Sequence, residues 1–227
     1  MSLARLAPLA ALIVTGACRA SRAAPPAPVA IEVHGALREL MHGGSTEGRV
    51  AVADVVTPTT VAVGALAGLR GEVTILDGVV HTSRVEAGSV VAGRGPGDQR
   101  AALLVSATVP AWRVVPITDP IAADDLERRV GELLRDASAA DPTPFVIEGS
   151  FPILDWHVVD GPHQHGAPSG VIRATPGAAL LVGFYSTKHE GTFTHMGQTT
   201  HVHVIAGGET GHVDRVAIDA GAHLRVP

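Results

Sequence analysis

Short apolar runs broken by glycine and proline dominate the chain from residue 50 onward. Such runs, rich in valine and isoleucine and bounded by turn-forming residues, are typical of β-strands. They lie at residues 101–109, 145–148, 153–159, 171–174, 178–185, 201–205, 212–218 and 223–226. A hairpin is also predicted where the runs 72–76 and 79–85 flank Asp77-Gly78, because Asp-Gly suits a two-residue turn. The pattern therefore predicts a protein built mainly from strands.

Two segments follow the helical period instead. Apolar positions in residues 33–41 are spaced as on one helix face, which predicts a short helix closed by Gly43-Gly44. A longer amphipathic helix is predicted after Asp119-Pro120. We expect an α+β fold with two mixed or antiparallel β-sheet regions and a few helices. Its parts would be an N-terminal α+β region (31–140) and a C-terminal β-rich, metal-binding region (141–227).

Residues 1–30 have the pattern of an export signal followed by a linker rich in proline and alanine. Arg5 precedes the apolar stretch 6–14, which is too short to remain as a membrane anchor. Cys18 follows two small residues, as at the site where bacterial lipoproteins are cut and acylated, and ordinary cleavage a few residues later is the alternative. We therefore expect an exported protein, periplasmic or anchored to the membrane only through a lipid on Cys18.

Composition narrows the classes of function. Of 227 residues, 46% are hydrophobic, and the net charge of -5 comes without a basic cluster, which argues against nucleic-acid binding. The sequence has no G-x-S-x-G motif, no P-loop, and a single cysteine that lies in the signal, so nucleophilic catalysis and phosphate binding are not supported. The 12 histidines instead suggest a histidine-ligated metal, and the lone cysteine excludes a cysteine zinc ribbon or a disulfide scaffold.

Three histidines are spaced so that they can meet. His201 and His203 are two apart in a predicted strand, so their rings project from one face. His212 follows a Gly207-Gly208 turn, from which an adjacent antiparallel strand can return it to the same place. Three nitrogen ligands with an open position suit catalytic Zn²⁺, and also iron, copper, nickel or manganese. The alternative is surface or core histidines without a metal.

The remaining histidines that we weighed have a simpler interpretation as solvated or structural side chains: His34, His42, His163, His165, His189, His195 and His223.

An ordered set of motifs spans most of the chain. The run LLVGF (180–184) is followed by a loop and then by His201-x-His203 and Gly211-His212. Upstream, the glycine-rich segment 63–78 contains G-E and ends in L-D-G, and strands at 103–109 and 144–151 lie between the two parts. In order and spacing this set resembles the bacterial alpha-acetolactate decarboxylase family, of which the chain would be a diverged, exported member.

The resemblance implies a zinc-dependent lyase that converts 2-acetolactate, or a related small-molecule 2-hydroxy-3-oxo acid, to acetoin and carbon dioxide. It also suggests a homodimer. By motif position, His201, His203 and His212 would hold the metal, and Glu72 would be the acidic residue beside it. A carboxyl group there can return a proton to the carbanionic carbon that decarboxylation leaves. The alternative for Glu72 is an ion pair with the nearby Arg70.

The chain departs from the family at the residue expected to hold the substrate carboxylate. The family has an arginine where our alignment places His157, and an imidazole does not offer the bidentate grip of a guanidinium. Arg173 or Arg113 could take that role in its place. The family also supplies an acidic residue from a C-terminal tail, for which this sequence has no counterpart before Pro227.

These departures leave two alternatives to the enzyme. In one, the chain is an exported, non-catalytic metal-binding lipoprotein in which His157, with His163 and His165, approaches the metal and fills its open position. In the other, it is a structural lipoprotein that holds no metal. A site that keeps a water ligand favours catalysis, whereas a closed site favours binding.

Overall fold

The computed structural model describes residues 29–42, 44–162 and 169–227. Its helices are α1 (Leu37–His42), α2 (Val52–Val55) and α3 (Leu126–Asp136), with 3-10 turns η1 (Ala67–Leu69) and η2 (Ala123–Asp125). The strands are β1 (Ile31–His34), β2 (Val50–Ala51), β3 (Thr60–Leu66), β4 (Glu72–Leu76), β5 (Val79–Glu86), β6 (Ser89–Arg94), β7 (Arg100–Thr108), β8 (Arg113–Ile117), β9 (Thr143–Phe151), β10 (Ile153–Val159), β11 (Gly170–Ala174), β12 (Gly177–Tyr185), β13 (Thr200–Ala206), β14 (Glu209–Ala217) and β15 (Ala222–Val226).

The strands form two antiparallel sheets, as the expected α+β class requires. The first has the order β1-β7-β3-β4-β5-β6, with β2 beside β7. The second has the order β11-β10-β14-β13-β12-β9-β15-β8. The predicted hairpin is confirmed, because Asp77 (φ 49°) and Gly78 (φ 76°) both take the positive φ that a tight turn between β4 and β5 needs.

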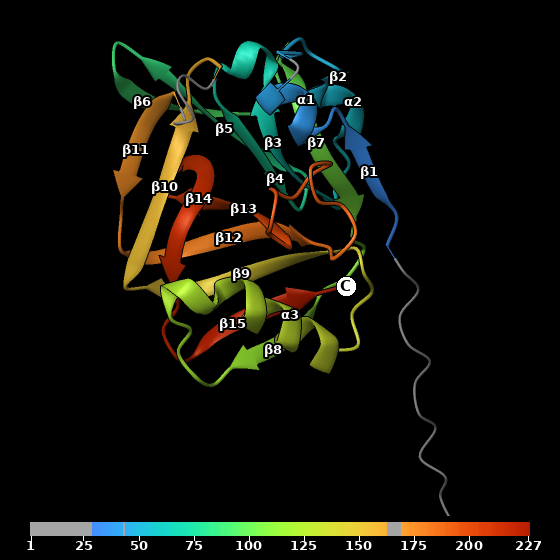
Figure 1. The fold of residues 1–227 in the computed structure, drawn as a ribbon, viewed down its shortest axis with the longest axis vertical. Coiled ribbons are helices and arrows are strands. Elements are labelled where there is room, and N and C mark those ends of the chain that lie inside the picture. Colours follow the sequence, from blue (N-terminus) through green and yellow to red (C-terminus); the bar gives the residue numbers. More distant parts are fainter. Residues whose placement is uncertain (1–28, 43, 163–168) are drawn as a thin grey trace, which may run out of the picture.

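The two sheets lie against each other and share a core (Figure 1). Val63 and Val105 of the first sheet pack in one apolar cluster with Val146 and Val182 of the second. Helix α3 lies on the far side of the second sheet in the same view, which explains why its apolar face carries packing and no chemistry. No helix in the described part of the chain is long and apolar enough to cross a membrane.

Two element boundaries differ from the sequence predictions. Val33, expected to lie on the helix face, belongs to β1, because the backbone of Ile31–His34 pairs with β7 and that pairing outweighs a weak helical period. The long helix begins at Leu126 after the turn η2, and Asp119-Pro120 precedes it without capping it. Along the chain, the change from the first sheet to the second falls between Thr108 and Arg113.

Candidate metal centre and its pocket

A row of histidines crosses three neighbouring strands of the second sheet. His157 on β10 lies opposite His212 on β14, and His212 lies opposite His203 on β13. The register of β13 and β14 follows from the turn between them, where Gly207 (φ 58°) and Gly208 (φ 93°) take conformations that only glycine adopts without strain. The hairpin therefore brings His212 back beside His203.

Close packing at Gly211 adjusts the position of the neighbouring His212. A side-chain carbon on Gly211 would lie 2.4 Å from the carbonyl oxygen of His157 and 2.4 Å from the Trp156 ring. Only glycine allows β14 to approach β10 this closely, so Gly211 is part of what aligns the row.

The structure brings the three predicted ligands together. The ring centroids of His201 and His203 are 5.2 Å apart, those of His201 and His212 are 5.3 Å apart, and those of His203 and His212 are 6.0 Å apart. His201 and His203 are buried, and the His212 side chain is 17% exposed. The same-face relation expected of His201 and His203 on one strand accounts for the arrangement.

A chain of hydroxyl groups fixes the orientation of His203. The Thr210 hydroxyl donates to the carbonyl oxygen of Val204 at 2.7 Å and lies 2.6 Å from the Thr74 hydroxyl. Thr74 must therefore donate to Thr210, which leaves its oxygen to accept a hydrogen bond from Nδ1 of His203 at 3.0 Å. This assigns the proton of His203 to Nδ1 and leaves Nε2 with a free lone pair, the arrangement that second partners impose on metal-binding histidines.

The other two rings also fit a metal. Nδ1 of His201 is buried without a hydrogen-bond partner among the described residues, which is costly for a polar atom unless a ligand meets it. Burial lowers the pKa of His201 and of His203 well below the usual value, and it lowers the pKa of His212 as well. The three imidazoles are thus neutral near neutral pH, which is the form that binds Zn²⁺.

Glu72 lies beside this cluster and is buried (4% exposed) at the start of β4. Its Oε1 accepts a hydrogen bond from the backbone N–H of Val159 at 3.2 Å, and its Oε2 lies 3.8 Å from Nε2 of His203. Burial raises the pKa of Glu72 to about 8. Arg70 pairs with Asp160 at 2.9 Å, so the ion pair considered for Glu72 is formed by a different carboxylate.

His157 belongs to the same site and is paired with a residue that the sequence analysis missed. Its Nδ1 donates to both carboxylate oxygens of Asp214, at 2.8 and 2.9 Å, while Nδ1 of His212 lies 3.4 Å from Asp214 Oδ1. Burial opposes ionisation of Asp214, but hydrogen bonds from the two imidazoles hold the pKa of Asp214 well below its usual value. Burial by itself would lower the pKa of His157. The hydrogen bond and the charge of Asp214 more than offset this effect, so the pKa of His157 is raised.

The closest group of potential ligand atoms is not the predicted set. Among the described residues, atoms of His157, His212 and Asp214 lie within 4.8 Å of one another. These short distances are those of Nδ1–H groups that share one carboxylate acceptor, and an ion between them would replace these hydrogen bonds. With Nδ1 of His157 and His212 turned toward Asp214, their Nε2 atoms remain for a ligand elsewhere.

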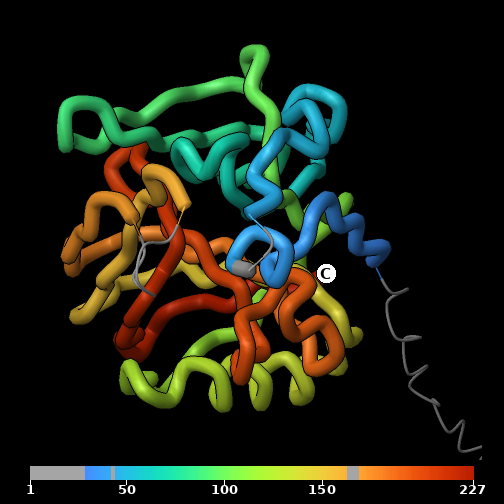
Figure 2. The backbone as a smooth tube through the Cα atoms, turned by 45° about the horizontal axis from the view of Figure 1, so that its top comes forward, coloured from blue at the N-terminus to red at the C-terminus, as the bar shows by residue number. Residues whose placement is uncertain are grey.

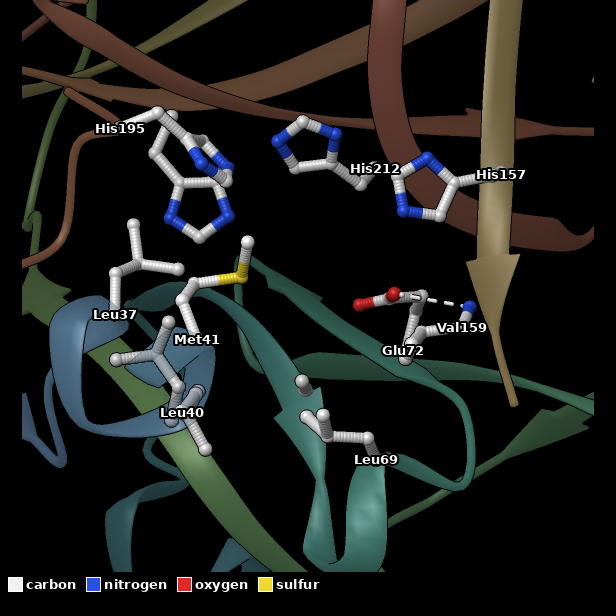
Figure 3. Close-up of a pocket in the computed structure, with 12 residues that line it drawn as sticks. Leu37, Leu40, Met41, Leu69, Glu72, His157, Val159, His195 and His212 are labelled. Atoms are coloured by element: carbon white, nitrogen blue, oxygen red, sulfur yellow. Dashed lines mark hydrogen bonds between the residues drawn. The ribbon is translucent and has the colours of Figure 1, made fainter. Parts of the chain in front are cut away.

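One pocket joins these groups to an aliphatic wall (Figure 3). Glu72, His157, His195, His201 and His212 line its polar side. The other lining residues are aliphatic: Leu37, Leu40, Met41, Ala65, Leu69, Leu103 and Val159.

His195 was expected to be solvated, but it is half-buried, and its ring centroid lies 5.1 Å from that of His212. Its loop position gives no periodic signal, which is why the sequence pattern does not reveal it.

The arginines considered as substitutes lie elsewhere. Arg173 pairs with Glu209 at 2.7 Å, and Arg113 donates to the carbonyl oxygens of Pro227 and Ala137, both at 3.0 Å. Neither lines the pocket, and no lysine or arginine is among its described lining residues. Of the three residues considered for the substrate carboxylate, only His157 lines the pocket.

Four further histidines from the sequence analysis fall into two groups. His163 and His165 lie outside the described residues. His189 stacks on Phe193 with ring centroids 4.9 Å apart, and His223 is exposed on β15, so both have structural or solvated positions as expected.

The fold and the site together define an α+β protein in which a buried histidine cluster and a buried carboxyl group share one pocket between two antiparallel sheets. The chain belongs to the alpha-acetolactate decarboxylase family, whose sequence model matches residues 33–225. No protein with a curated description matches the sequence significantly.

Solved structures support the same fold. A Staphylococcus aureus protein of unknown function, similar to alpha-acetolactate decarboxylase, superposes with a TM-score of 0.67 at 18% identity, over 87% of this chain and 84% of that chain. Acetolactate decarboxylase from Bacillus subtilis subspecies spizizenii gives 0.65 at 16% identity, over 86% and 84%. Alpha-acetolactate decarboxylase from Bacillus subtilis strain 168 gives 0.64 at 17% identity, over 87% and 85%.

Proposed function

We propose that the protein is a metal-dependent carboxy-lyase that converts 2-acetolactate, or a related 2-hydroxy-3-oxo acid, to acetoin and carbon dioxide. The observation that carries the proposal is the convergence of His201, His203 and His212 beside the buried Glu72, with His201, His212 and Glu72 lining one pocket. Membership of the family supports the same reaction class.

We propose His201, His203 and His212 as the residues that hold the metal, with Zn²⁺ as the ion that best suits three neutral imidazoles. When bound, the ion supplies a Lewis acid that stabilises negative charge on the substrate oxygens. The protein holds the rings ready for it. Thr74 orients His203, and Asp214 accepts from Nδ1 of His212.

In the reaction, the bond between C1 and C2 of the substrate breaks, and its electron pair passes into the enolate of C2, C3 and the ketone oxygen. Carbon dioxide leaves, and C2 then takes up one proton to give acetoin. Glu72 is the group placed to hold and deliver that proton, because its carboxyl group lies beside the histidines inside the pocket. His157, held by Asp214, faces the substrate carboxylate from the β10 side.

The test is acetoin formation from racemic 2-acetolactate by zinc-loaded protein, with bound metal measured in the same samples. We expect turnover in the wild type and its loss in His201→Ala, with metal lost, and in Glu72→Gln, with metal retained. His223→Ala is the control, because that side chain is exposed outside the pocket. Full metal occupancy without turnover in the wild type would contradict the decarboxylase.

One observation favours a second candidate, a metal-binding protein without catalysis. The ring of His157 is 5.1 Å from that of His212, as close as the predicted ligands are to one another. If Nε2 of His157 reaches the ion, it closes the position that substrate needs. Absorption spectra of the Co²⁺-loaded protein test this: addition of 2-acetolactate changes the spectrum of an open site and leaves that of a closed site unchanged.

Export, a lipid on Cys18 and a homodimer remain proposals taken from the sequence, and the first 28 residues lie outside the described part. Mass spectrometry of the protein isolated from membranes tests the lipid. Sedimentation of purified protein tests the dimer.

A further inference from the structure

The wall of the pocket opposite the histidines is hydrocarbon. Leu37 and Leu40 of α1 and Leu69 of η1 are at most 8% exposed, and all three line the pocket. The smallest substrate of this class carries only methyl groups, which would cover little of such a wall. The pocket itself has a volume of about 70 Å³, which on this measure is room for roughly five waters and thus for a reacting head group alone.

A second cavity continues the pocket toward solvent. Its volume is about 410 Å³, and Leu37, Met41 and His195 line both spaces. Met196 and Arg38 line the outer part alone. A ligand held at the histidines can therefore extend outward past Met41 along a mainly apolar surface.

The mouth of this cavity is a defined structure made by two segments far apart in sequence. Backbone N–H groups of Leu37 and Arg38 donate to the carbonyl oxygens of Thr192 and Gly191, both at 2.9 Å. Figure 2 shows the blue segment that carries α1 beside the orange loop that carries these acceptors. The two hydrogen bonds fix the start of α1 against the loop.

Apart from Met1, the chain has two methionines, Met41 and Met196, and both lie at this mouth. Met41 is 37% exposed and Met196 is 74% exposed, and they face one cavity. Apolar side chains that adjoin one another at an opening are a feature of ligand-binding grooves. Methionine suits an alkyl ligand because its flexible, polarizable side chain adapts to chains of different length.

The ends of the pocket set the direction of a substrate. Glu72 and His157 lie at one end, and His195, Leu37 and Met41 lie at the other (Figure 3). Under the proposed function, C2 and the carboxylate face Glu72 and His157, so the acyl group on C3 points toward Met41 and the outer cavity. This step rests on that function.

We infer that the physiological substrate is a 2-hydroxy-3-oxo acid whose acyl chain is longer than acetyl and occupies the cavity between α1 and the 190–196 loop. The chain is unbranched or lightly branched hydrocarbon, because Leu37, Met41 and Met196 give its path a mainly apolar lining, to which Arg38 adds one charged side chain.

Binding of unreactive analogues tests this without turnover. 2,3-Dihydroxy-2-methylbutanoate and its hexanoate and octanoate homologues lack the 3-oxo group and cannot lose carbon dioxide. Titration calorimetry with the zinc-loaded protein is expected to show affinity rising about threefold per added methylene, near the value for burying one methylene group. Met196→Asp should reduce this gain, because it places a charge in the mouth. Ile172→Asp, at a residue 72% exposed on β11, is the matched control and should keep the gain.

The failures are distinguishable. Equal affinity for all three acids in the wild type, or an equal gain in Met196→Asp, overturns the alkyl site and leaves the decarboxylase standing. Absence of binding by any of the acids overturns the proposed function, and the alkyl site with it.

Discussion

Two carboxyl groups, Glu72 and Asp214, lie close to the same histidines, but their surroundings shift their pKa values in opposite directions. Glu72 is buried and receives one backbone hydrogen bond, so the pKa of Glu72 rises to about 8. The side chain of Asp214 is 37% exposed and receives hydrogen bonds from His157 and His212, so the pKa of Asp214 falls. Burial without a charged partner favours a proton, whereas paired imidazoles favour the anion. Opposite pKa shifts of this kind make one carboxyl group, here Glu72, suited to donate a proton and the other, Asp214, suited to orient its neighbours as an anion.

The largest expected effect comes from Glu72→Gln. If Glu72 delivers the proton to C2, its loss should lower kcat by about 10²- to 10⁴-fold, the usual range for a general acid or base. Asp214→Asn makes the same replacement of a carboxyl group by an amide at the other position, and it should lower kcat far less. Steady-state kinetics of the two variants measure the contrast, and equal losses in both would break it.

Stability of the metal-free protein against pH separates the two carboxylates next. Because the pKa of Glu72 is about 8 in the folded protein and 4.5 for an unperturbed glutamate, its contribution to stability is full below pH 4.5 and is lost as pH rises through 8. The loss is on the order of a few kcal/mol. The buried histidines have lowered pKa values and act in the opposite sense below about pH 6.5.

The contribution of Glu72 is therefore read from the difference between the wild type and Glu72→Gln in urea unfolding at pH 5 and pH 8, with chelator present. We expect the wild type to lose more stability than the variant over this range. The same slope in both proteins would mean that Glu72 does not hold its proton when folded.

A third prediction concerns the interior side of the row. Thr74→Val keeps the shape of the side chain but removes the acceptor for Nδ1 of His203. Loss of such an orienting partner should weaken Zn²⁺ binding about 10- to 100-fold. Thr74→Ser keeps the hydroxyl and should restore affinity. Competition with a chromophoric chelator measures both, and a valine variant with wild-type affinity would contradict the tautomer assigned to His203.

The smallest effect is expected at the exposed side of the row. Asp214→Asn removes the charge that holds His157, and because Asp214 is partly exposed we expect about 1 kcal/mol, or roughly a fivefold rise in KM. A rise in KM with kcat nearly unchanged is the signature of carboxylate positioning. A loss of bound metal larger than that in Thr74→Val would instead assign Asp214 to the ion.

Local patterns were enough to predict much of this site. The alternation of His201 and His203 and the glycine turn before His212 specify a hairpin geometry, and the hairpin forms as expected. The G-E at Gly71 and Glu72 marks a strand start that the resemblance already singled out. These features depend on contacts close in sequence, which is why spacing reveals them.

What spacing did not reveal depends on contacts distant in sequence. Asp214 acquires its role only because β10 pairs with β14 and brings His157 to it. His195 reaches the pocket from a loop without periodicity, and the Thr74 hydroxyl meets His203 across the two sheets. Likewise, Val33 lies in β1 because the strand pairs with β7. The helical spacing of nearby apolar residues gives no information about this distant partner.

A crystal structure of the zinc-loaded protein, with an anomalous difference map at the zinc edge, would show whether His201, His203 and His212 hold the metal. We expect one peak about 2.0–2.1 Å from a nitrogen of each of these three rings, with Asp214 still accepting from Nδ1 of His157. A peak between His157, His212 and the Asp214 carboxylate, with His201 and His203 free of it, would overturn this assignment of the ligands.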